Sequence, residues 1–157
     1  QVISFLSQLQ LEQVDGVHLV IVPGSTLENW LREFENFSPG LNVVPYYGSQ
    51  AERPTLQQKI EDDFGEIDVI VTTYDMTVKP DDNKFLRNLG PSVCVYDEAH
   101  ALRNPKSDRY RQLMRIKADF KVPRRSTSTT SSSTRQPPRM LTTPRSFRHS
   151  ALLVHGQ

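Results

Sequence analysis

The amino-acid sequence predicts an α/β fold over residues 1–122, with a parallel sheet covered by helices on both faces. Three observations support this prediction. Short apolar runs recur at intervals of about 25 residues, the length of one strand and its crossover helix. The runs Leu19–Val22 and Val69–Val71 contain no polar residue, as is typical of strands buried on both faces. Between the runs, apolar residues recur with helical spacing.

The chain is expected to begin within a helix, because apolar residues near its start recur three and four positions apart. These are Val2, Phe5, Leu6 and Leu9. After a first strand at 17–22, a second helix is expected to open with a capping box. In that box the Ser25 hydroxyl and the Glu28 carboxylate would satisfy free backbone N–H groups.

Three more strands and two more helices complete the predicted order. The strands span residues 41–46, 68–71 and 92–96, and the helices span residues 51–62 and 104–117. The last helix is expected to have Asn104 as its N-cap and Pro105 at its first position. Its buried side is expected to hold Tyr110, Leu113 and Met114.

Composition divides the chain near residue 122. Residues 1–122 hold 13 of the 19 Lys and Arg and all 18 Asp and Glu, whereas residues 123–157 hold six Arg and no acid. The second segment also contains 13 Ser and Thr, so it has too little apolar surface to offset the entropy of ordering. We therefore predict one domain at 1–122 and a disordered Ser/Thr/Arg-rich tail at 123–157.

Two classes of protein are disfavoured by the sequence. No apolar run approaches the roughly 20 residues that cross a bilayer, so a soluble protein without membrane contact is expected. The one cysteine, Cys94, lies within an apolar run. This predicts a buried, unreactive thiol, with no internal disulfide and no cysteine-based zinc site.

The strongest chemical motif is residues 93–100, Val-Cys-Val-Tyr-Asp-Glu-Ala-His, an apolar strand that ends in two adjacent acids. In nucleotide-hydrolysing folds the first acid, here Asp97, holds Mg²⁺ through water. The second, here Glu98, orients the attacking water. Taken alone, the pair fits a solvated acidic turn after a core strand equally well.

Parallel strands deliver the loops that follow them to one edge of a sheet, where ligands bind. Three polar segments are expected to meet at this edge: residues 23–26, 72–74 and 97–100. Ser25 and Thr26 open a helix whose N–H groups suit a phosphate, and Thr72 and Thr73 offer hydroxyls for the same use. Each also has an ordinary structural interpretation, as a helix cap or a β-branched strand end.

Five segments occur in a characteristic order along the chain. They are Gln1–Leu6, Val22–Trp30, Tyr46–Ser49, Val69–Tyr74 and Asp97–His100. In this order they resemble the first motor lobe of the Swi/Snf chromatin-remodelling ATPases, over residues 1 to about 121. Residues 25–34 and 113–118 point to the subfamily of Swi/Snf-related regulators of chromatin that contain a DEAD/H box.

The resemblance implies a RecA-like lobe of a nuclear motor that uses ATP and Mg²⁺ to move on double-stranded DNA and to slide or evict nucleosomes. Asp97 would hold Mg²⁺ through water, Glu98 would activate water, and His100 would link the nucleotide state to the rest of the motor. The residues implied to lie against the DNA backbone are Pro23, Ser25, Thr26, Asn29, Thr72 and Thr73. Such contacts read no base sequence.

The sequence departs from the family pattern in two places. No G-x-x-x-x-G-K-[ST] phosphate loop occurs in the 157 residues. Phe120-Lys121 is followed by Val122-Pro123-Arg124, where the family continues into a strand and a Gly-Thr-Pro turn. We therefore expect the strand before Asp97 to lack its sheet neighbours, which would leave the chain marginally stable and aggregation-prone. We also expect that the chain by itself does not hydrolyse ATP.

The residues leave three alternatives open. The chain is part of a chromatin-remodelling ATPase, or a non-catalytic short form that binds DNA or a partner, or a lobe of an RNA helicase, where Asp-Glu-Ala-His also occurs. The Asn29-Trp30 pair and Thr72-Thr73-Tyr74 favour the chromatin motor over the RNA helicase. The tail after residue 122 is either a basic arm that touches nucleic acid weakly or sequence foreign to the family.

Overall fold

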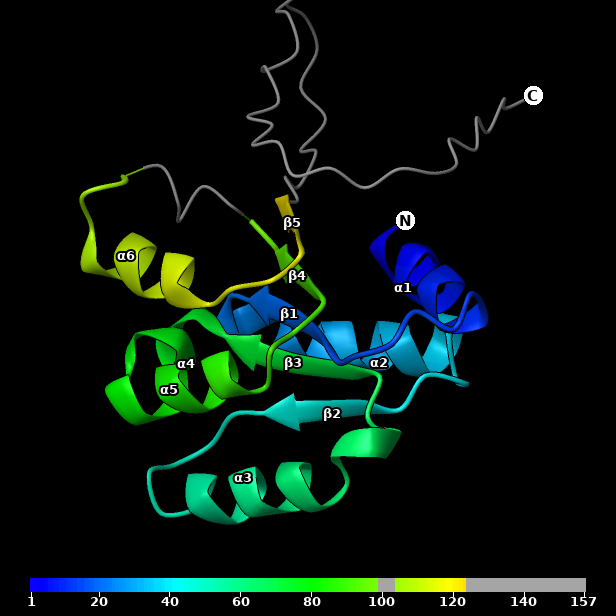
Figure 1. Cartoon of the computed structure of the whole chain (residues 1–157), viewed down its shortest axis with the longest axis horizontal. Helices are drawn as coiled ribbons and strands as arrows, with labels where there is room; N and C mark the ends of the chain where they lie inside the picture. The colour runs from blue at the N-terminus through cyan, green and yellow to red at the C-terminus, as the bar shows by residue number, and fades with distance from the viewer. Residues whose placement is uncertain (99–103, 124–157) are drawn as a thin grey trace, which may run out of the picture. The chain divides into compact units, whose positions relative to one another are not determined.

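A five-stranded parallel sheet organises the computed structural model, which describes residues 1–98 and 104–123 (Figure 1). The strands are β1 (His18–Val22), β2 (Val43–Tyr46), β3 (Val69–Thr73), β4 (Val93–Tyr96) and β5 (Phe120–Pro123). Their order across the sheet is β2-β3-β1-β4-β5, and every neighbouring pair is parallel. The predicted fold class is confirmed.

Six α-helices occur in the described chain, the first before β1 and the others between strands. They are α1 (Val2–Leu11), α2 (Leu27–Phe37), α3 (Arg53–Asp62), α4 (Tyr74–Val78), α5 (Pro80–Asn88) and α6 (Asp108–Arg115). The sequence predicts four of these and misses α4 and α5. Both are short, and α5 begins with Pro-Asp-Asp-Asn-Lys, which has no apolar stripe.

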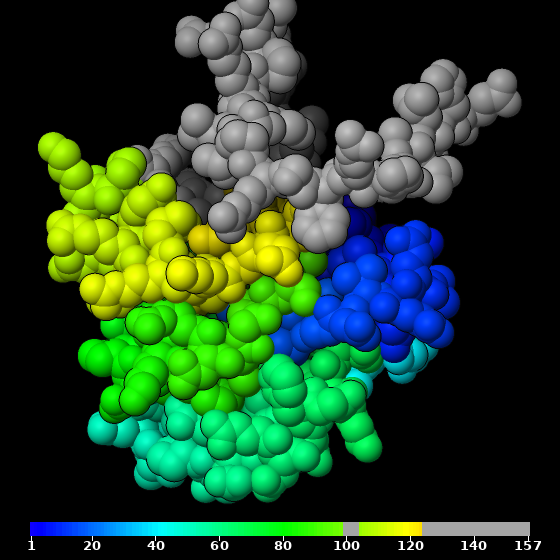
Figure 2. All heavy atoms as spheres, in the orientation of Figure 1, coloured from blue at the N-terminus to red at the C-terminus, as the bar shows by residue number. Residues whose placement is uncertain are grey.

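The sheet separates two hydrophobic cores, because side chains on a strand point alternately to its two faces. One core joins the sheet to α1 and α2 and contains Ile3, Leu6, Val20, Val22, Leu27, Trp30, Phe34, Val69, Val71, Val93 and Val95. The other joins it to α3–α6 and contains Leu19, Ile21, Tyr46, Ile60, Ile70, Tyr74, Phe85, Leu86, Cys94, Tyr96 and Leu113. Helices therefore cover both faces, as predicted. In Figure 2, α6 and the chain leading to β5 (yellow) adjoin α4 and α5 (green).

The strand before Asp97 has a neighbour on each side, so the expectation that it lacks them is wrong. It pairs with β1 on one side and β5 on the other, in a register from Val93↔Phe120 to Tyr96↔Pro123. Unpaired N–H and C=O groups of a strand bind any extended segment that reaches them. In β5, Phe120 is 68% exposed and only Val122 packs against the core, so this strand has little of the apolar pattern of a buried strand.

The last helix begins three residues later than the capping pattern predicts. Ser107 is the N-cap of α6, and its hydroxyl accepts the N–H of Tyr110 at 3.2 Å. Asn104 serves a turn instead, in which its Oδ1 accepts the N–H of Lys106 at 3.0 Å. Leu113 is fully buried and Met114 is half-buried, so the predicted inner side of this helix is confirmed.

The tail predicted at 123–157 lies outside the described residues, apart from Pro123 at the end of β5. Over residues 1–98 and 104–123, no helix combines the length and the hydrophobicity that a membrane crossing needs.

His18 in β1 makes stability sensitive to acid. It is buried, and its Nδ1 has no hydrogen-bond partner among the described residues. Burial lowers the pKa of His18 below its ordinary value of 6.5, an effect that the charge of Asp68 opposes. Because the unfolded chain takes up this proton more readily, the free energy of unfolding is expected to fall as the pH drops below 6.5.

Urea titrations of the wild type and of His18→Leu, at pH 7 and at about pH 5.5, measure this effect. The wild type is expected to lose more stability between the two pH values than the variant does. Equal losses would show that His18 does not contribute.

Candidate functional site at the carboxyl edge of the sheet

The loops that follow β1, β3 and β4 meet at one edge of the sheet. The register pairs Val22, the last residue of β1, with Thr73, the last residue of β3. Asp97 directly follows β4 and donates its backbone N–H to the carbonyl of Ile21 at 2.9 Å. Because Pro23 continues from Val22, the segments that begin at Pro23 and Asp97 and the end of β3 lie together. The predicted convergence is confirmed.

Further hydrogen bonds hold the carboxylate and the backbone carbonyl of Asp97 in place. Its Oδ2 accepts the indole N–H of Trp30 at 2.8 Å, and its Oδ1 accepts the backbone N–H of Glu98 at 3.0 Å. Its backbone carbonyl accepts the hydroxyl of Tyr74 at 2.5 Å. With both carboxylate oxygens engaged and 6% of the residue exposed, the carboxylate has a fixed orientation at the edge of the sheet.

Glu98 continues the turn in an unusual backbone conformation. Its φ is 51°, in the left-handed region, which costs a residue with a Cβ about 1–2 kcal/mol. The turn leaves Glu98 half-exposed beside the buried Asp97. Strained residues of this kind cluster at functional sites. His100, the third predicted member of this motif, lies outside the described residues.

The segment after β1 folds differently from the predicted capping box. Gly24–Thr26 forms a 3₁₀ turn, η1, and Thr26 rather than Ser25 is the N-cap of α2. The Thr26 hydroxyl donates to the carbonyl of Pro23 at 3.0 Å and closes that turn. Glu28 accepts the hydroxyl of Tyr47 at 2.7 Å, so its carboxylate is drawn to the loop after β2. The capping box is therefore wrong, while Ser25 is left exposed.

The remaining candidate DNA-facing residues differ in accessibility. Asn29 lies exposed on α2, and its amide donates to Glu33 at 3.0 Å along the helix. Thr72 is fully buried, and its hydroxyl donates to the carbonyl of Tyr46 at 2.7 Å. The Thr72 hydroxyl is therefore not available to a ligand at the edge, contrary to the prediction from the sequence. Thr73 lies at the edge with 7% of its surface exposed.

A buried polar network supports the loop after β2. Asp82 of α5 forms an ion pair with Arg53 of α3 and accepts the hydroxyl of Tyr46 at 2.5 Å. Gln57 donates its amide to the same hydroxyl at 2.7 Å. Burial, reinforced by Asp82, raises the pKa of Tyr46. Sequence reasoning missed this network because it did not predict α5, and a buried Asp cannot be told from a surface one without that helix.

Sequence reasoning also missed the roles of Trp30 and Tyr74. Trp30 is one of the buried residues of α2, and the helical spacing of such residues gives no sign of its N–H bond to Asp97, 67 positions away. Tyr74 bonds to Asp97 across 23 positions. In both cases the available clue was an aromatic side chain with a polar group, which usually has a hydrogen-bond partner when it is buried.

The edge provides part of what a nucleotide site needs. Among the described residues, no three His, Cys, Asp or Glu side chains are grouped to hold a metal ion directly. A single fixed carboxylate such as Asp97 still fits Mg²⁺, which keeps most of its waters in proteins. The G-x-x-x-x-G-K-[ST] loop that cradles phosphates is not among these 157 residues. The chain therefore fits the magnesium side of such a site and not the phosphate cradle.

A parallel sheet covered by helices on both faces, with an Asp-Glu pair after an inner strand, is the arrangement of a RecA-like fold. Comparison with known families agrees with this assignment. The chain belongs to the SNF2-related domain family, whose model matches residues 1–125.

Curated relatives include helicases and SWI/SNF-related regulators of chromatin. The chain is 50% identical over 123 residues to the ATP-dependent helicase FUN30 of Saccharomyces cerevisiae, covering 78% of this chain and 11% of that protein. It is 45% identical over 123 residues to the Caenorhabditis elegans homolog of the SWI/SNF-related matrix-associated actin-dependent regulator of chromatin subfamily A containing DEAD/H box 1. That match covers 78% of this chain and 12% of the relative. The chain thus spans about a tenth of the length of these relatives.

A solved structure shows the same fold. The Sulfolobus solfataricus SWI2/SNF2 ATPase core in complex with dsDNA superimposes with a TM-score of 0.66 at 24% identity. The match covers 78% of this chain and 24% of that one. The family assignment and the named relatives do not support the alternative of an RNA helicase lobe.

Proposed function

We propose that the chain is part of an ATP-driven motor that moves along double-stranded DNA in the nucleus and slides or evicts nucleosomes. The observation that carries the proposal is the meeting of the η1 turn, Thr73 and Asp97-Glu98 at one edge of the sheet. Its relatives are named as ATP-dependent helicases and regulators of chromatin, and the solved structure of the same fold contains dsDNA. In this proposal residues 1–122 belong to the ATP-binding lobe and residues 123–157 are a separate segment.

The two acids divide the nucleotide chemistry between them. Asp97 holds Mg²⁺ through water, which its fixed and mostly buried carboxylate suits. Glu98 is half-exposed and orients the attacking water, and His100 links this site to the rest of the motor. Mg²⁺ and ATP, when bound in the complete site, supply the phosphoryl-transfer chemistry.

The DNA-facing surface consists of the η1 turn and the beginning of α2, with Thr73 beside them. Ser25 and Asn29 are exposed there, and Pro23 and Thr26 shape the turn that presents them. N–H groups at the beginning of a helix suit a phosphate oxygen. Thr72 contributes by fixing the end of β3 to β2 rather than by touching DNA.

Fluorescence anisotropy with labelled duplex DNA and single-stranded RNA of equal length tests the DNA-binding part. We expect tighter binding to the duplex, with affinity that falls as salt rises. Ser25→Glu is expected to weaken duplex binding about fivefold, the equivalent of losing one hydrogen bond worth about 1 kcal/mol. Gln58→Glu, which makes the same charge change at an exposed position of α3, serves as the control. Preference for RNA, or equal effects of both substitutions, would contradict the proposal.

Binding of DNA or a partner without catalysis is the second candidate for a polypeptide of these 157 residues, because they contain no G-x-x-x-x-G-K-[ST] motif. Phosphate release by the purified chain, with and without duplex DNA, addresses catalysis directly. We expect no DNA-stimulated hydrolysis by these 157 residues and DNA binding that is unchanged by ATP. Measurable DNA-stimulated hydrolysis would show that the chain holds ATP without that motif.

A further inference from the structure

We propose that Trp30 and Tyr74 are positioning residues that couple the DNA-facing segments to the carboxylate of Asp97. This inference rests on the proposed function, because it concerns how DNA at the edge of the sheet is sensed at the magnesium-binding acid.

Trp30 connects the first DNA-facing segment to the side chain of Asp97. It lies in the first turns of α2, which begins directly after the η1 turn, so no flexible loop separates the two. Its ring is buried and packs against Phe34, with ring centroids 5.9 Å apart. Its N–H donates to the carboxylate at 2.8 Å, a charge-assisted bond with a narrow preferred geometry. Displacement of the beginning of α2 therefore displaces the donor that orients Asp97.

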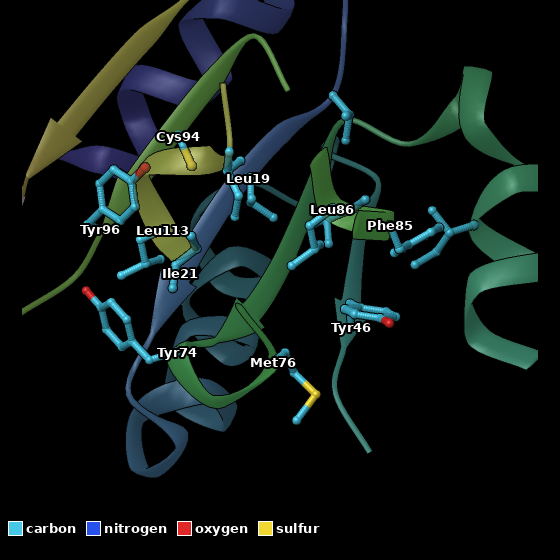
Figure 3. Close-up of a cluster of buried hydrophobic side chains, with 14 of the residues drawn as sticks. Leu19, Ile21, Tyr46, Tyr74, Met76, Phe85, Leu86, Cys94, Tyr96 and Leu113 are labelled. Atoms are coloured by element: carbon cyan, nitrogen blue, oxygen red, sulfur yellow. The ribbon is translucent and has the colours of Figure 1, made fainter. Parts of the chain in front are cut away.

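Tyr74 connects the second DNA-facing segment to the backbone of Asp97. It directly follows Thr73 at the end of β3, and its hydroxyl donates to the carbonyl of Asp97 at 2.5 Å. Figure 3 shows Tyr74 in the core between the sheet and α3–α6, near Ile21 and Leu113.

The two aromatic residues reach Asp97 from opposite layers of the fold. Trp30 belongs to the core between the sheet and α1–α2, whereas Tyr74 belongs to the core between the sheet and α3–α6. One fixes the carboxylate and the other fixes the backbone that carries it. A shift of either helical layer against the sheet therefore tilts Asp97, whichever DNA-facing segment moves first.

A merely structural role is the competing explanation, since buried polar groups need partners wherever they occur. The two explanations differ in one respect. Under coupling, DNA bound at the η1 turn changes the hydrogen bond of Trp30, whereas a merely structural bond stays as it is in the free chain.

The experiment uses the single tryptophan of the chain, which gives one indole N–H cross-peak in a ¹⁵N–¹H correlation spectrum. In the free chain, Asp97→Asn is expected to shift this cross-peak, because it removes the charge from the acceptor. An unmoved cross-peak in a folded Asp97→Asn chain would overturn the proposal.

Duplex DNA is then titrated into the wild-type chain. The indole cross-peak is expected to shift and to saturate at the same DNA concentration as the backbone amides of residues 24–29. Amides that shift beside an unmoved indole cross-peak would overturn the coupling and leave DNA binding intact. No shift of any cross-peak would overturn DNA binding and the coupling together.

A pair of hydroxyl deletions tests the Tyr74 arm. Tyr74→Phe keeps the ring and removes the donor to Asp97, and it is expected to move the indole cross-peak of the free chain. Tyr110→Phe removes the hydroxyl of a half-buried tyrosine in α6 and is expected to leave the indole cross-peak unshifted. Equal responses to the two substitutions would overturn the role of Tyr74.

Discussion

Replacing Asp82 with alanine is expected to lower the free energy of unfolding by about 3–5 kcal/mol. Asp82 is buried in α5, where it pairs with the buried guanidinium of Arg53 and accepts the Tyr46 hydroxyl. Without the carboxylate, the buried guanidinium of Arg53 loses its ion-pair partner and keeps its charge beside the Ser49 carbonyl, which accepts its Nε–H at 3.3 Å. The same substitution releases α5 from α3 and from the end of β2. Urea unfolding followed by circular dichroism measures the loss.

An exposed ion pair provides the matched control. Arg109 and Asp75 lie 3.3 Å apart with side chains 46% and 71% exposed, so Asp75→Ala is expected to change stability by at most about 1 kcal/mol. The double variant Arg53→Met/Asp82→Leu is expected to recover much of the stability lost in Asp82→Ala, because it removes both charges. Similar losses for Asp82→Ala and Asp75→Ala would show that the buried pair is not what holds α5.

Replacing Leu113 with alanine is expected to cost about 2–5 kcal/mol of stability. Leu113 is the one fully buried residue of α6. Figure 3 shows it near Tyr96 and Ile21, in the core between the sheet and α3–α6. Removing its branched end leaves a cavity at the only position where this helix is fully anchored. We therefore expect α6 to loosen before the sheet unfolds.

Cys94 reports that loosening. Burial raises the pKa of its thiol to about 11, so the folded wild type is expected to react slowly with a thiol reagent near neutral pH. In Leu113→Ala the rate is expected to rise at urea concentrations that leave the sheet folded. Met114→Ala, at a half-buried neighbouring position, is expected to have a smaller effect on both measurements. Equal effects of the two variants would place the anchor of α6 elsewhere.

The parts of the fold that sequence reasoning predicts are those with a dense apolar pattern. Strands β1 and β3 lie at the centre of the sheet and are buried along their whole length, so their runs of Val, Ile and Leu identify them. β5 is missed because an edge strand needs only one inward side chain, here Val122. α5 is missed because its buried residues include Asp82 and Asn83, whose polarity predicts a surface position.

The candidate site follows the same division. The rule that parallel strands deliver their loops to one edge is sufficient to bring Pro23, Thr73 and Asp97 together. The hydrogen bonds within that edge are set by individual atoms, and no periodic pattern encodes them. The hydroxyl of Thr72 therefore turns inward to Tyr46, and Glu28 joins Tyr47 instead of capping α2.

At Glu98, the left-handed backbone favours glycine, whereas the proposed chemistry needs a carboxylate. Glycine would relax this turn, yet it would remove the carboxylate that the proposed chemistry uses. Selection for stability alone would therefore favour glycine at this position. The glutamate found at this position fits a requirement for the acid, because conformational ease alone does not explain it.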